Sequence, residues 1–468
     1  MEFKPQSLRL QFLQHGVRSA EELARSARVS QPTISRALRR LPDSLVRIGR
    51  GRSTRYGLEN PIGDLGSDWP LYVIGSEGAP EQIGRLFSLL GGKYWLDAGT
   101  NTWPSLMDSN FEGNVFPDLP WFLDDYRPQG FLGRAFARKH AAALGQQTNP
   151  AGWSGRTVVE AMLRFGDDFS GAFVLGRDAL AAAMSGEPTP VAYSERSSQY
   201  PRLAELALRG DLVGSSAGGE QPKFVTSVSD PQRVRPVIVK FSPPMNEEAG
   251  RRWADLLFAE HTACSILAER GYEVSRGEIL DAGGCRYLEV DRFDRTKNGG
   301  RLPVISLRAL AAALLDGVAV PWPSAAASLL ENGWLGQEQA GQLASIWEFG
   351  RLIGNTDMHD GNTSLIFAPR KPVRLAPVYD MLPMAYRPDS FGRVHGVSEE
   401  QLGACASAPP GREREMAESF WVALAGSEMV SKDFRAIAHA HVKALRGKVQ
   451  PRADRGETSI APGKKSKK

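Results

Sequence analysis

Cysteine is scarce in this chain: Cys264, Cys285 and Cys405 are the three cysteines among its 468 residues. They form no CxxC pair and no even-numbered framework, which argues against both a disulfide scaffold and a structural zinc site. Thiols that stay reduced are typical of the cytosol, so we expect a cytoplasmic protein.

Long apolar runs are also missing. Residues 1–16 contain no extended apolar stretch of the kind that marks a secretory signal. The most apolar segment, residues 307–330, is interrupted by Asp316, Pro321 and Pro323. A membrane-spanning helix needs about 20 continuous apolar residues, so we expect no membrane partner.

What remains is an ordinary globular composition. Hydrophobic residues make up 42% of the chain and charged residues 24%, which excludes a wholly disordered or collagen-like protein. The length predicts about three structural units.

Charge is distributed unevenly along the chain. The formal net charge is +4, but residues 1–58 carry +8 and residues 441–468 carry +7, which leaves −11 for residues 59–440. Blocks of basic charge are typical of units or tails that meet polyanions. We predict a disordered basic tail over residues 441–468 and leave open whether it binds DNA or is only solvated.

The N-terminal residues show the pattern of a small helical unit followed by a hairpin. Helical spacing covers residues 6–14 and 20–26, and Ser19 with Glu22 forms a capping box before the second helix. Ser30 is the expected N-cap of a third helix that ends near residue 41. Short strands at residues 45–48 and 53–56 then flank a glycine-bearing turn.

The third helix and the hairpin tip carry the basic side chains of this unit. A helix fits the major groove of DNA, and the segment resembles the winged helix-turn-helix domains of bacterial regulators. We therefore predict that residues 1–58 bind double-stranded DNA; the alternative is a protein-interaction domain with a solvated basic face. The expected DNA-binding residues are Thr33, Arg36, Arg39, Arg40, Arg50 and Arg52.

Two further units are expected after a linker at residues 61–66, which holds Pro61, Gly63 and Gly66. Residues 59–200 contain a strand at 71–75 and helical patterns at 131–144 and 157–165. Residues 201–440 place strands first and long helical patterns later, which predicts a mixed helix and sheet fold.

The most informative stretch is residues 355–362, where Asp357 and Asn362 have the spacing D-x-x-x-x-N. In protein kinases such an aspartate positions the substrate hydroxyl, while the asparagine and a later aspartate hold Mg²⁺. Asp380 ends an extended run that follows this loop. Because aspartate-rich loops are usually only turns, the spacing alone is weak support.

Three upstream elements strengthen the kinase interpretation. Residues 215–224 form a glycine-bearing loop whose backbone amides can cradle phosphates. A strand pattern over residues 236–241 contains Lys240, which suits a lysine that pairs with phosphate. A second strand pattern, residues 287–291, leads into a polar link that suits an adenine-binding hinge.

Five segments in this order resemble the HipA family of bacterial serine/threonine kinases, the toxins of toxin–antitoxin systems. This chain departs from the family at Asp291, which replaces a glutamate, and at Met358, which replaces a glycine. The resemblance implies an α+β fold: a HipA-like bilobal protein-kinase-like fold, here preceded by a small winged helix-turn-helix domain. The matching segments are Ser216–Lys223, Val239-Lys240, Val290–Arg295, Thr356–Asn362 and Tyr379-Asp380.

The resemblance also implies roles for individual residues. Asp357 is the expected catalytic base, His359 orients its loop or only packs, and ATP and Mg²⁺ are the expected cofactors. Glu260 is either the partner of Lys240 or a plain surface glutamate. The implied Mg²⁺ ligands are Asn362 and Asp380; the implied ATP contacts are Lys240, Asp291, Phe293, Gly218, Gly219, Gln221 and Lys223; the implied autophosphorylation site is Ser216.

Three functions remain open at this point. The first is an active kinase that acts on a protein phosphoacceptor and is tethered to DNA, with or without an antitoxin partner. The second is a DNA-binding transcription regulator whose kinase fold is inactive or only senses nucleotide. The third is a small-molecule kinase, because a fold does not determine the acceptor.

Overall fold

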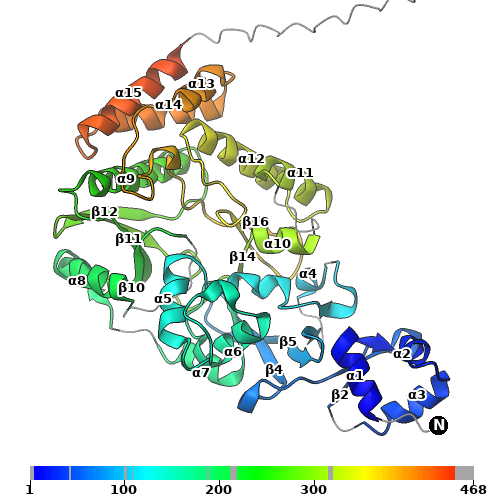
Figure 1. Cartoon of the computed structure of the whole chain (residues 1–468). Helices are drawn as coiled ribbons and strands as arrows, with labels where there is room; N and C mark the ends of the chain where they lie inside the picture. Colours follow the sequence, from blue (N-terminus) through cyan, green and yellow to red (C-terminus); the bar gives the residue numbers. More distant parts are fainter. Residues whose placement is uncertain are drawn as a thin grey trace, which may run out of the picture.

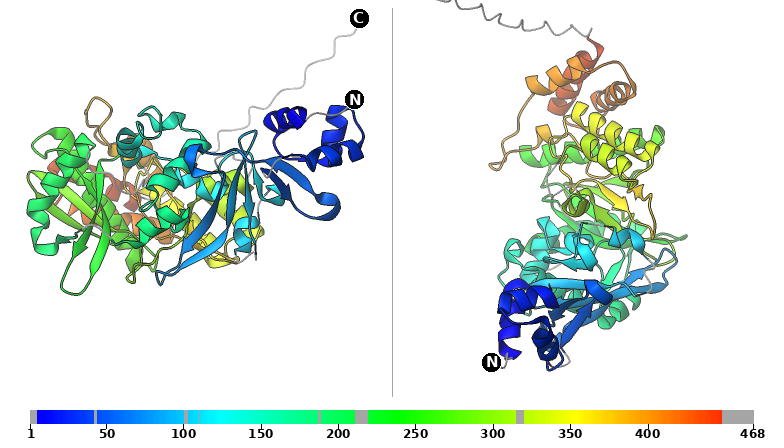
Figure 2. Two further views of the ribbon diagram at one scale, coloured as in Figure 1. Left: turned by 90° about the horizontal axis from the view of Figure 1, so that it is seen from below. Right: turned by 90° about the vertical axis from the view of Figure 1, so that its right-hand side faces the viewer.

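The computed structural model describes residues 5–41, 44–99, 103–108, 110–186, 189–210, 219–314 and 320–447. Ser216, Gly218 and residues 448–468 lie outside these ranges. Residues 441–446, which we predicted to be part of a disordered tail, are helical, so that part of the prediction is wrong. The described chain mixes helices and sheets, and its parts follow one another from the N-terminal unit at one end to the last helices, in residues 399–446, at the other (Figures 1 and 2).

The N-terminal unit holds three helices and a three-stranded sheet in the order β1-β3-β2. The predicted capping box is confirmed, because Ser19 Oγ accepts from Glu22 N at 3.1 Å and Glu22 Oε2 accepts from Ser19 N at 2.7 Å. The predicted hairpin is confirmed as well, but its second strand starts two residues later than expected. The elements are α1 (Pro5–His15), β1 (Arg18–Ser19), α2 (Ala20–Ala27), α3 (Gln31–Leu38), β2 (Leu45–Ile48) and β3 (Arg55–Leu58).

The cap expected at Ser30 is only half present. Ser30 does precede α3 with extended backbone, but its side chain makes no capping hydrogen bond. Its hydroxyl lies 2.8 Å from Thr33 Oγ1 instead, so the two side chains satisfy each other.

The N-terminal unit packs directly on the sheet that follows it. Val17, Val46 and Ile48 are buried in one apolar cluster with Leu89 of that sheet. Two backbone bonds join the units, from Leu90 N to Leu58 O at 2.7 Å and from Asn60 N to Ser88 O at 2.8 Å. Ile62 is 1% exposed and belongs to the main core, so the expected linker over residues 61–66 does not separate the two units.

The middle unit is built on a five-stranded sheet of order β7-β6-β5-β4-β8, with all neighbouring pairs antiparallel. The strand predicted at 71–75 is β4, and the helix predicted at 157–165 is α6. Its elements are β4 (Asp68–Ile74), β5 (Pro80–Leu89), β6 (Lys93–Asp97), α4 (Pro104–Met107), β7 (Val115–Phe116), α5 (Gly130–His140), α6 (Gly155–Phe165), β8 (Phe173–Leu175) and α7 (Arg177–Met184).

A second five-stranded sheet, of order β12-β13-β11-β10-β9, forms the next unit (Figure 1). α9 connects β11 to β12 along the chain and packs on β13, while α8 packs on β10 and β12. The elements are β9 (Val191–Ala192), α8 (Arg196–Arg209), β10 (Lys223–Ser229), β11 (Val234–Phe241), α9 (Glu248–Glu269), β12 (Gly277–Ala282) and β13 (Cys285–Asp291).

The remaining unit is mainly helical and contains a small sheet of order β14-β15-β16. One apolar core runs from Trp69 in β4 to Leu445 in the last helix. The elements are β14 (Val304–Ser306), α10 (Leu307–Leu314), α11 (Trp322–Glu331), α12 (Gln337–Leu352), β15 (Ser364–Ile366), β16 (Arg374–Leu375), α13 (Glu399–Ser407), α14 (Arg412–Ala425) and α15 (Lys432–Arg446).

A buried polar cluster lies where the last helices meet the segment after Asp380. His441 of α15 is 0% exposed; its Nε2 lies 2.5 Å from Tyr386 Oη and its Nδ1 lies 3.2 Å from Cys405 Sγ. The ring also stacks on Trp421 at 4.0 Å. Burial lowers the pKa of His441 to about 4, so the imidazole is neutral at ordinary pH.

In the part of the chain that the structure describes, no helix combines the length and the apolar character needed to span a bilayer.

Candidate active site

The centre of the candidate site is a buried lysine between two carboxylates. Lys240 lies near the end of β11, and its Nζ contacts Glu260 Oε1 of α9 at 2.5 Å and also contacts Asp380 Oδ1. Lys240 and Glu260 are 6% and 3% exposed, so neither charge is hydrated. Such burial is tolerated only when opposite charges meet, as they do here. Glu260 is therefore not the surface glutamate of the alternative interpretation.

Each charge in this cluster changes the pKa of its neighbours. Burial alone would lower the pKa of Lys240, but Asp380 and Glu260 raise it above its ordinary value. Burial opposes ionisation of Asp380, yet Lys240 and Lys223 hold its pKa below the ordinary range. The cluster thus holds a charged ammonium beside an ionised carboxylate, which is the polarity that a phosphate and its metal require.

A second lysine lies beside the first. Lys223 begins β10 directly opposite Lys240 in the antiparallel register, so both side chains are on one face of the sheet. Burial, followed by repulsion from Lys240, lowers the pKa of Lys223 to about 8 even though Asp380 opposes the shift. The sequence places Lys223 in a loop, whereas the structure makes it a strand residue of the site.

Gly219 packs closely against this cluster. Its φ is +90°, and a β-carbon there would lie 2.8 Å from Lys223 Nζ and 3.7 Å from Asp380 Oδ2. A residue with a side chain would therefore be strained and would crowd the ammonium group of Lys223, so this position favours glycine. Gln221, two residues on, has a buried Nε2 that donates to no described residue. Both features fit a loop that faces a ligand.

The loop at residues 355–362 is tied to Asp380 by side-chain amides. Asn355 Nδ2 donates to Asp380 O at 3.2 Å, and Asn355 Oδ1 accepts from Asp357 N at 3.1 Å. Asn362 Nδ2 donates to Asp357 O at 2.8 Å, which closes the loop. Asp380 itself has a φ of +53°, a left-handed backbone that is strained for a residue with a β-carbon. Strain of this kind is concentrated at functional sites.

His359 bends back onto its own loop, where its Nδ1 accepts from Gly361 N at 3.0 Å. Its carbonyl accepts from Trp322 Nε1 at 3.3 Å. The side chain is thus held by the loop backbone, which agrees with a role in shaping the loop.

The two residues expected near adenine are placed differently. Phe293 stacks on Tyr379, with ring centroids 5.7 Å apart, so it lies next to the residue before Asp380. Asp291 is opposite Val237 in the sheet register, whereas Lys240 is opposite Leu288, so their side chains are on opposite faces. The Asp291 carboxylate pairs there with Arg235, and the structure does not bring it to the lysine cluster.

The Val290–Arg295 motif has a structural connection that the sequence does not reveal. Arg292 Nη1 and Arg295 Nη2 both contact Asp168 Oδ1 at 2.8 Å, and Arg292 also pairs with Asp294. Asp294 Oδ2 accepts from Gly171 N at 2.9 Å. The motif therefore joins the sheet unit to the Phe165–Ala172 segment of the middle unit.

Arg308 and Asp125 lie next to the loop at residues 355–362 but belong to none of the sequence motifs. Arg308 of α10 donates its backbone N to Asp360 O at 3.0 Å, and its side chain pairs with Asp125. Asp125 in turn accepts from Ser306, which is 181 residues away in the chain. Local periodicity cannot find such a contact, because only the folded chain brings the partners together.

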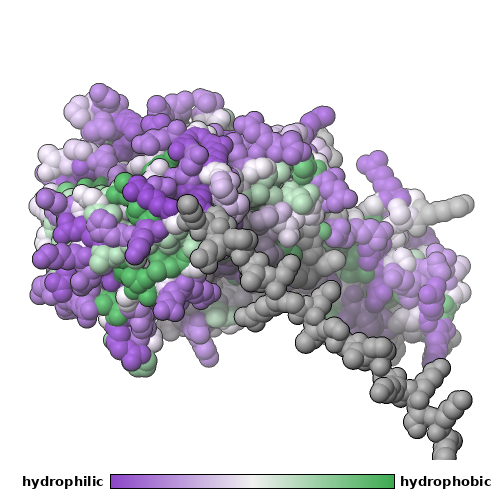
Figure 3. Space-filling model, turned by 90° about the horizontal axis from the view of Figure 1, so that it is seen from above, coloured by the Kyte–Doolittle hydropathy of each residue, from purple (hydrophilic) through white to green (hydrophobic). Residues whose placement is uncertain are grey.

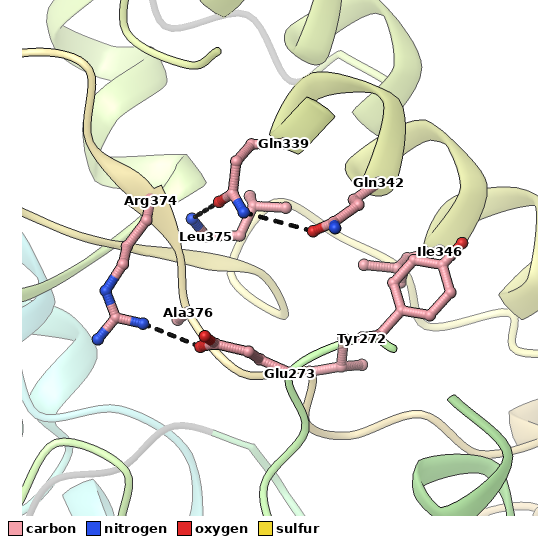
Figure 4. A pocket seen from close by; sticks show the side chains of 9 residues that line it. Tyr272, Glu273, Gln339, Gln342, Ile346, Arg374, Leu375 and Ala376 are labelled. Carbon is pink, nitrogen blue, oxygen red and sulfur yellow. Dashed lines mark hydrogen bonds and ion pairs between the residues drawn. The ribbon is translucent and has the colours of Figure 1, made fainter. Parts of the chain in front are cut away.

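A small hollow lies behind the segment that leads to Asp380 (Figure 4). Arg374 and Glu273 point toward each other across it and pair at 2.9 Å, and Gln339 donates to Gln342. Gln339 Oε1 also accepts from Leu375 N at 2.5 Å. Because these polar groups satisfy one another, and none of the sequence-predicted site residues lines the hollow, we do not assign the active site to it.

The basic residues of the N-terminal unit face water. Arg36, Arg39, Arg40 and Arg50 are exposed, and Thr33 is half-buried. Arg36 Nε donates to Pro32 O at 3.4 Å and Arg39 Nε to Ser35 O at 3.3 Å. The side chain of Arg52 lies outside what the structure describes. The visible face of this unit is mostly hydrophilic where it projects from the main body (Figure 3).

The donor set at the centre fits a magnesium nucleotide. Asp380 and Asn362 offer the hard oxygen ligands that Mg²⁺ prefers, and the two lysines offer positive charge to phosphates. The backbone of Gly219 comes close to both groups.

The chain is similar to known proteins. A family model described as "YjjJ-like toxin, middle domain" matches residues 65–184, and one described as "HipA-like C-terminal domain" matches residues 215–448. Toxin YjjJ of Escherichia coli (strain K12) is 34% identical over 447 residues, which cover 93% of this chain and 96% of that protein.

Solved structures are more distant. A chain from the Shewanella oneidensis MR-1 toxin–antitoxin complex of HipA, HipB and operator DNA aligns with a TM-score of 0.51 and 14% identity, covering 80% of this chain and 96% of that one. The Helicobacter pylori proinflammatory kinase CtkA aligns over 48% of this chain and 88% of its own, at 14% identity and a TM-score of 0.32, which is too low to support an argument. The first similarity concerns the fold alone.

Proposed function

The chain belongs to the family of YjjJ-like toxins with a HipA-like C-terminal domain, and from this premise we propose that it is a Mg-ATP-dependent protein serine/threonine kinase with its own DNA-binding unit. The observation that carries the proposal is the buried cluster in which Lys240 contacts Glu260 and Asp380. In protein kinases a strand lysine pairs with a glutamate of the neighbouring helix, and an aspartate holds the metal. The same three types meet here on β11, α9 and the segment after β16.

In the proposed reaction the acceptor hydroxyl oxygen bonds to the γ-phosphorus of ATP while the bond from that phosphorus to the bridging oxygen breaks, and ADP leaves. Asp357 orients the hydroxyl and takes its proton. Lys240 and Lys223 hold phosphate oxygens of the nucleotide. Asn362 and Asp380 are the proposed ligands of magnesium, which when bound neutralises negative charge on the phosphates.

The DNA-binding part of the proposal concerns the exposed face of α3 and the tip between β2 and β3. We propose that Thr33, Arg36, Arg39 and Arg40 enter the major groove and that Arg50 and Arg52 contact the backbone or minor groove. The net charge of +8 over residues 1–58 supports a polyanionic partner. The similar solved complex contains HipB and operator DNA, which supports DNA and an antitoxin as partners.

The kinase proposal is tested with full-length protein, radiolabelled ATP and Mg²⁺, alone and with a cell lysate. We expect transfer of label to protein, and a loss of about 10²–10⁴-fold in Asp357→Asn with ATP binding retained. Arg374→Ala, which alters an ion pair away from the loop, is the matched control and should label like wild type. Equal labelling by Asp357→Asn would remove this loop from the mechanism.

The same assay separates the other candidate functions. A DNA-binding regulator that only senses nucleotide would bind ATP and change its DNA affinity without transferring label. Turnover of ATP with lysate but without labelled protein would identify a small-molecule acceptor. Mass spectrometry of the purified protein after incubation tests the further proposal that Ser216 is autophosphorylated and that one phosphate there lowers ATP affinity.

A further inference from the structure

A positively charged side chain without an assigned role lies against the loop that carries Asp357 and Asn362. Arg308 is the second residue of α10, and its backbone N donates to Asp360 O inside that loop. A β-carbon at Gly361 would lie 3.4 Å from Arg308 Nη1, so the guanidinium rests directly on the loop backbone. Because Gly361 has no side chain, nothing at this position stands between the guanidinium and the loop backbone.

The start of α10 is anchored on both sides, which fixes the position of Arg308. Leu307 N donates to Thr363 O at 2.9 Å, immediately after Asn362. Ser306 Oγ accepts from Ala309 N at 3.1 Å and donates to Asp125 Oδ1 at 2.6 Å. These hydrogen bonds hold the start of α10 against the loop, so the backbone of Arg308 has a fixed position beside it.

The charge of Arg308 is only loosely compensated. Its Nη2 lies 3.5 Å from Asp125 Oδ1, and Asp125 is its only side-chain partner among the described residues. Arg292, by contrast, contacts two carboxylates at 2.8 and 2.9 Å with 2% of its side chain exposed. The Arg308 side chain is 38% exposed, so several of its N–H donors remain available to a ligand.

From this placement we propose that Arg308 contacts the phosphoryl group during its transfer and stabilises the negative charge that develops on it. The planar fork of a guanidinium matches phosphate oxygens in two-point contacts, and arginines placed in this way accelerate phosphoryl transfer in other enzymes. Asp125 is a positioning residue that holds the guanidinium beside the loop. The inference rests on the proposed kinase function and extends it to a residue outside the recognised motifs.

The test uses binding rather than activity as its readout. Full-length wild type, Arg308→Ala, Arg308→Lys and the control Arg374→Ala are titrated calorimetrically with MgADP, first alone and then with aluminium fluoride, which mimics the phosphoryl group in transfer. We expect fluoride to tighten MgADP binding in wild type and control. In Arg308→Ala the fluoride-induced increase in MgADP affinity should be about 10- to 100-fold smaller, which is the range expected for losing hydrogen bonds to a charged group. The affinity for MgADP alone should not change.

Arg308→Lys keeps the charge without the fork and should retain part of the fluoride effect. The inference is overturned if Arg308→Ala keeps the full effect, or if it weakens MgADP alone as much as the fluoride complex, because a structural or nucleotide-positioning role would do that.

Failure of the proposed function is visible without any variant. Wild type that neither binds MgADP nor transfers phosphate would refute both proposals. Wild type that transfers phosphate, together with an Arg308→Ala protein that matches it in every titration, would refute the Arg308 assignment alone.

Discussion

The outer face of α3 and the lysine cluster at the end of β11 both concentrate charged side chains, but the first leaves them exposed and the second buries them in pairs. Arg36 and Arg39 are exposed, and within the described residues their guanidinium groups bond to backbone carbonyls of α3 alone. Lys240 contacts both Glu260 and Asp380, and the side chains of Lys240 and Glu260 are buried.

The difference corresponds to two kinds of ligand. Exposed arginines attract a long polyanion from a distance, and salt weakens that attraction strongly. Charges that are buried in pairs respond little to salt, because the pair is screened poorly and each partner is costly to leave alone. We therefore expect the two regions to differ in their response to mutation, pH and salt.

The largest effect is expected from removing one charge of the buried cluster. Asp380→Asn should lower the free energy of unfolding by about 3–5 kcal/mol, because buried Lys240 then loses one of the two carboxylates that it contacts. Magnesium-nucleotide binding should fall with it, since a metal ligand is lost. Chemical denaturation and calorimetry measure both quantities.

Asp357→Asn serves as the control in the same candidate site, since the carboxylate of Asp357 makes no ion pair among the described residues. Its unfolding free energy should stay within about 0.5 kcal/mol of wild type. If Asp380→Asn is as stable as Asp357→Asn, the Asp380 charge does not stabilise the buried cluster, which contradicts the expected difference between buried and exposed charges.

The next effect concerns a buried group that stays neutral. The pKa of His441 is about 4 in the folded protein, below its ordinary value of 6.5, because of burial. The unfolded chain then binds more protons than the folded chain between these values, so stability falls as pH drops from 6.5 to 4, by about 3 kcal/mol in all. His441→Gln should remove this acid-dependent loss from unfolding curves measured across that range.

His439, two residues earlier on α15 and exposed, is the matched control. His439→Gln should keep the wild-type pH dependence. If His439→Gln rather than His441→Gln flattens the curve, burial is not the origin of the acid sensitivity.

A smaller effect is expected on the exposed side of the comparison. Arg36→Ala should weaken binding of the full chain to its preferred DNA by about 1–3 kcal/mol and relax specificity, if the side chain reads a base. Arg50→Ala should weaken all sequences alike and reduce the salt slope, as expected for a phosphate contact. Titrations at several salt concentrations measure both, and absence of DNA binding at low salt would leave the exposed arginines without a polyanionic ligand.

The smallest effect is expected at Asp291. Because its carboxylate pairs with Arg235 on the sheet face away from Lys240, Asp291→Asn should change ATP affinity by no more than about twofold, the range of substitutions outside a site. Phe293→Ala should weaken ATP more, since Phe293 stacks on Tyr379 beside Asp380. A large effect at Asp291 and none at Phe293 would reverse this assignment.

Much of the local structure follows from sequence alone. The capping box at Ser19, the hairpin after α3 and the strand that carries Lys240 depend on neighbours in the chain, and the structure confirms them. The spacing of Asp357 and Asn362 likewise produces a closed loop, through the bond between Asn362 Nδ2 and Asp357 O.

The parts that sequence reasoning missed depend on contacts between distant segments. The face occupied by Asp291 is set by the register of β13 on β11, which no local pattern encodes. Lys223 faces the site because β10 pairs with β11, and Arg308 does so because α10 begins beside the loop. The predicted linker failed for a related reason, since its prolines and glycines do not reveal that Ile62 enters the core.

The contact between the N-terminal unit and the middle sheet has a practical consequence for engineering. Val17, Val46 and Ile48 pack against Leu89. A fragment of residues 1–60 would therefore expose these apolar side chains to water. We therefore expect the N-terminal unit to be unsuitable for transfer to another protein by itself. A chimera that keeps its fold has to include β4–β6 as the supporting platform.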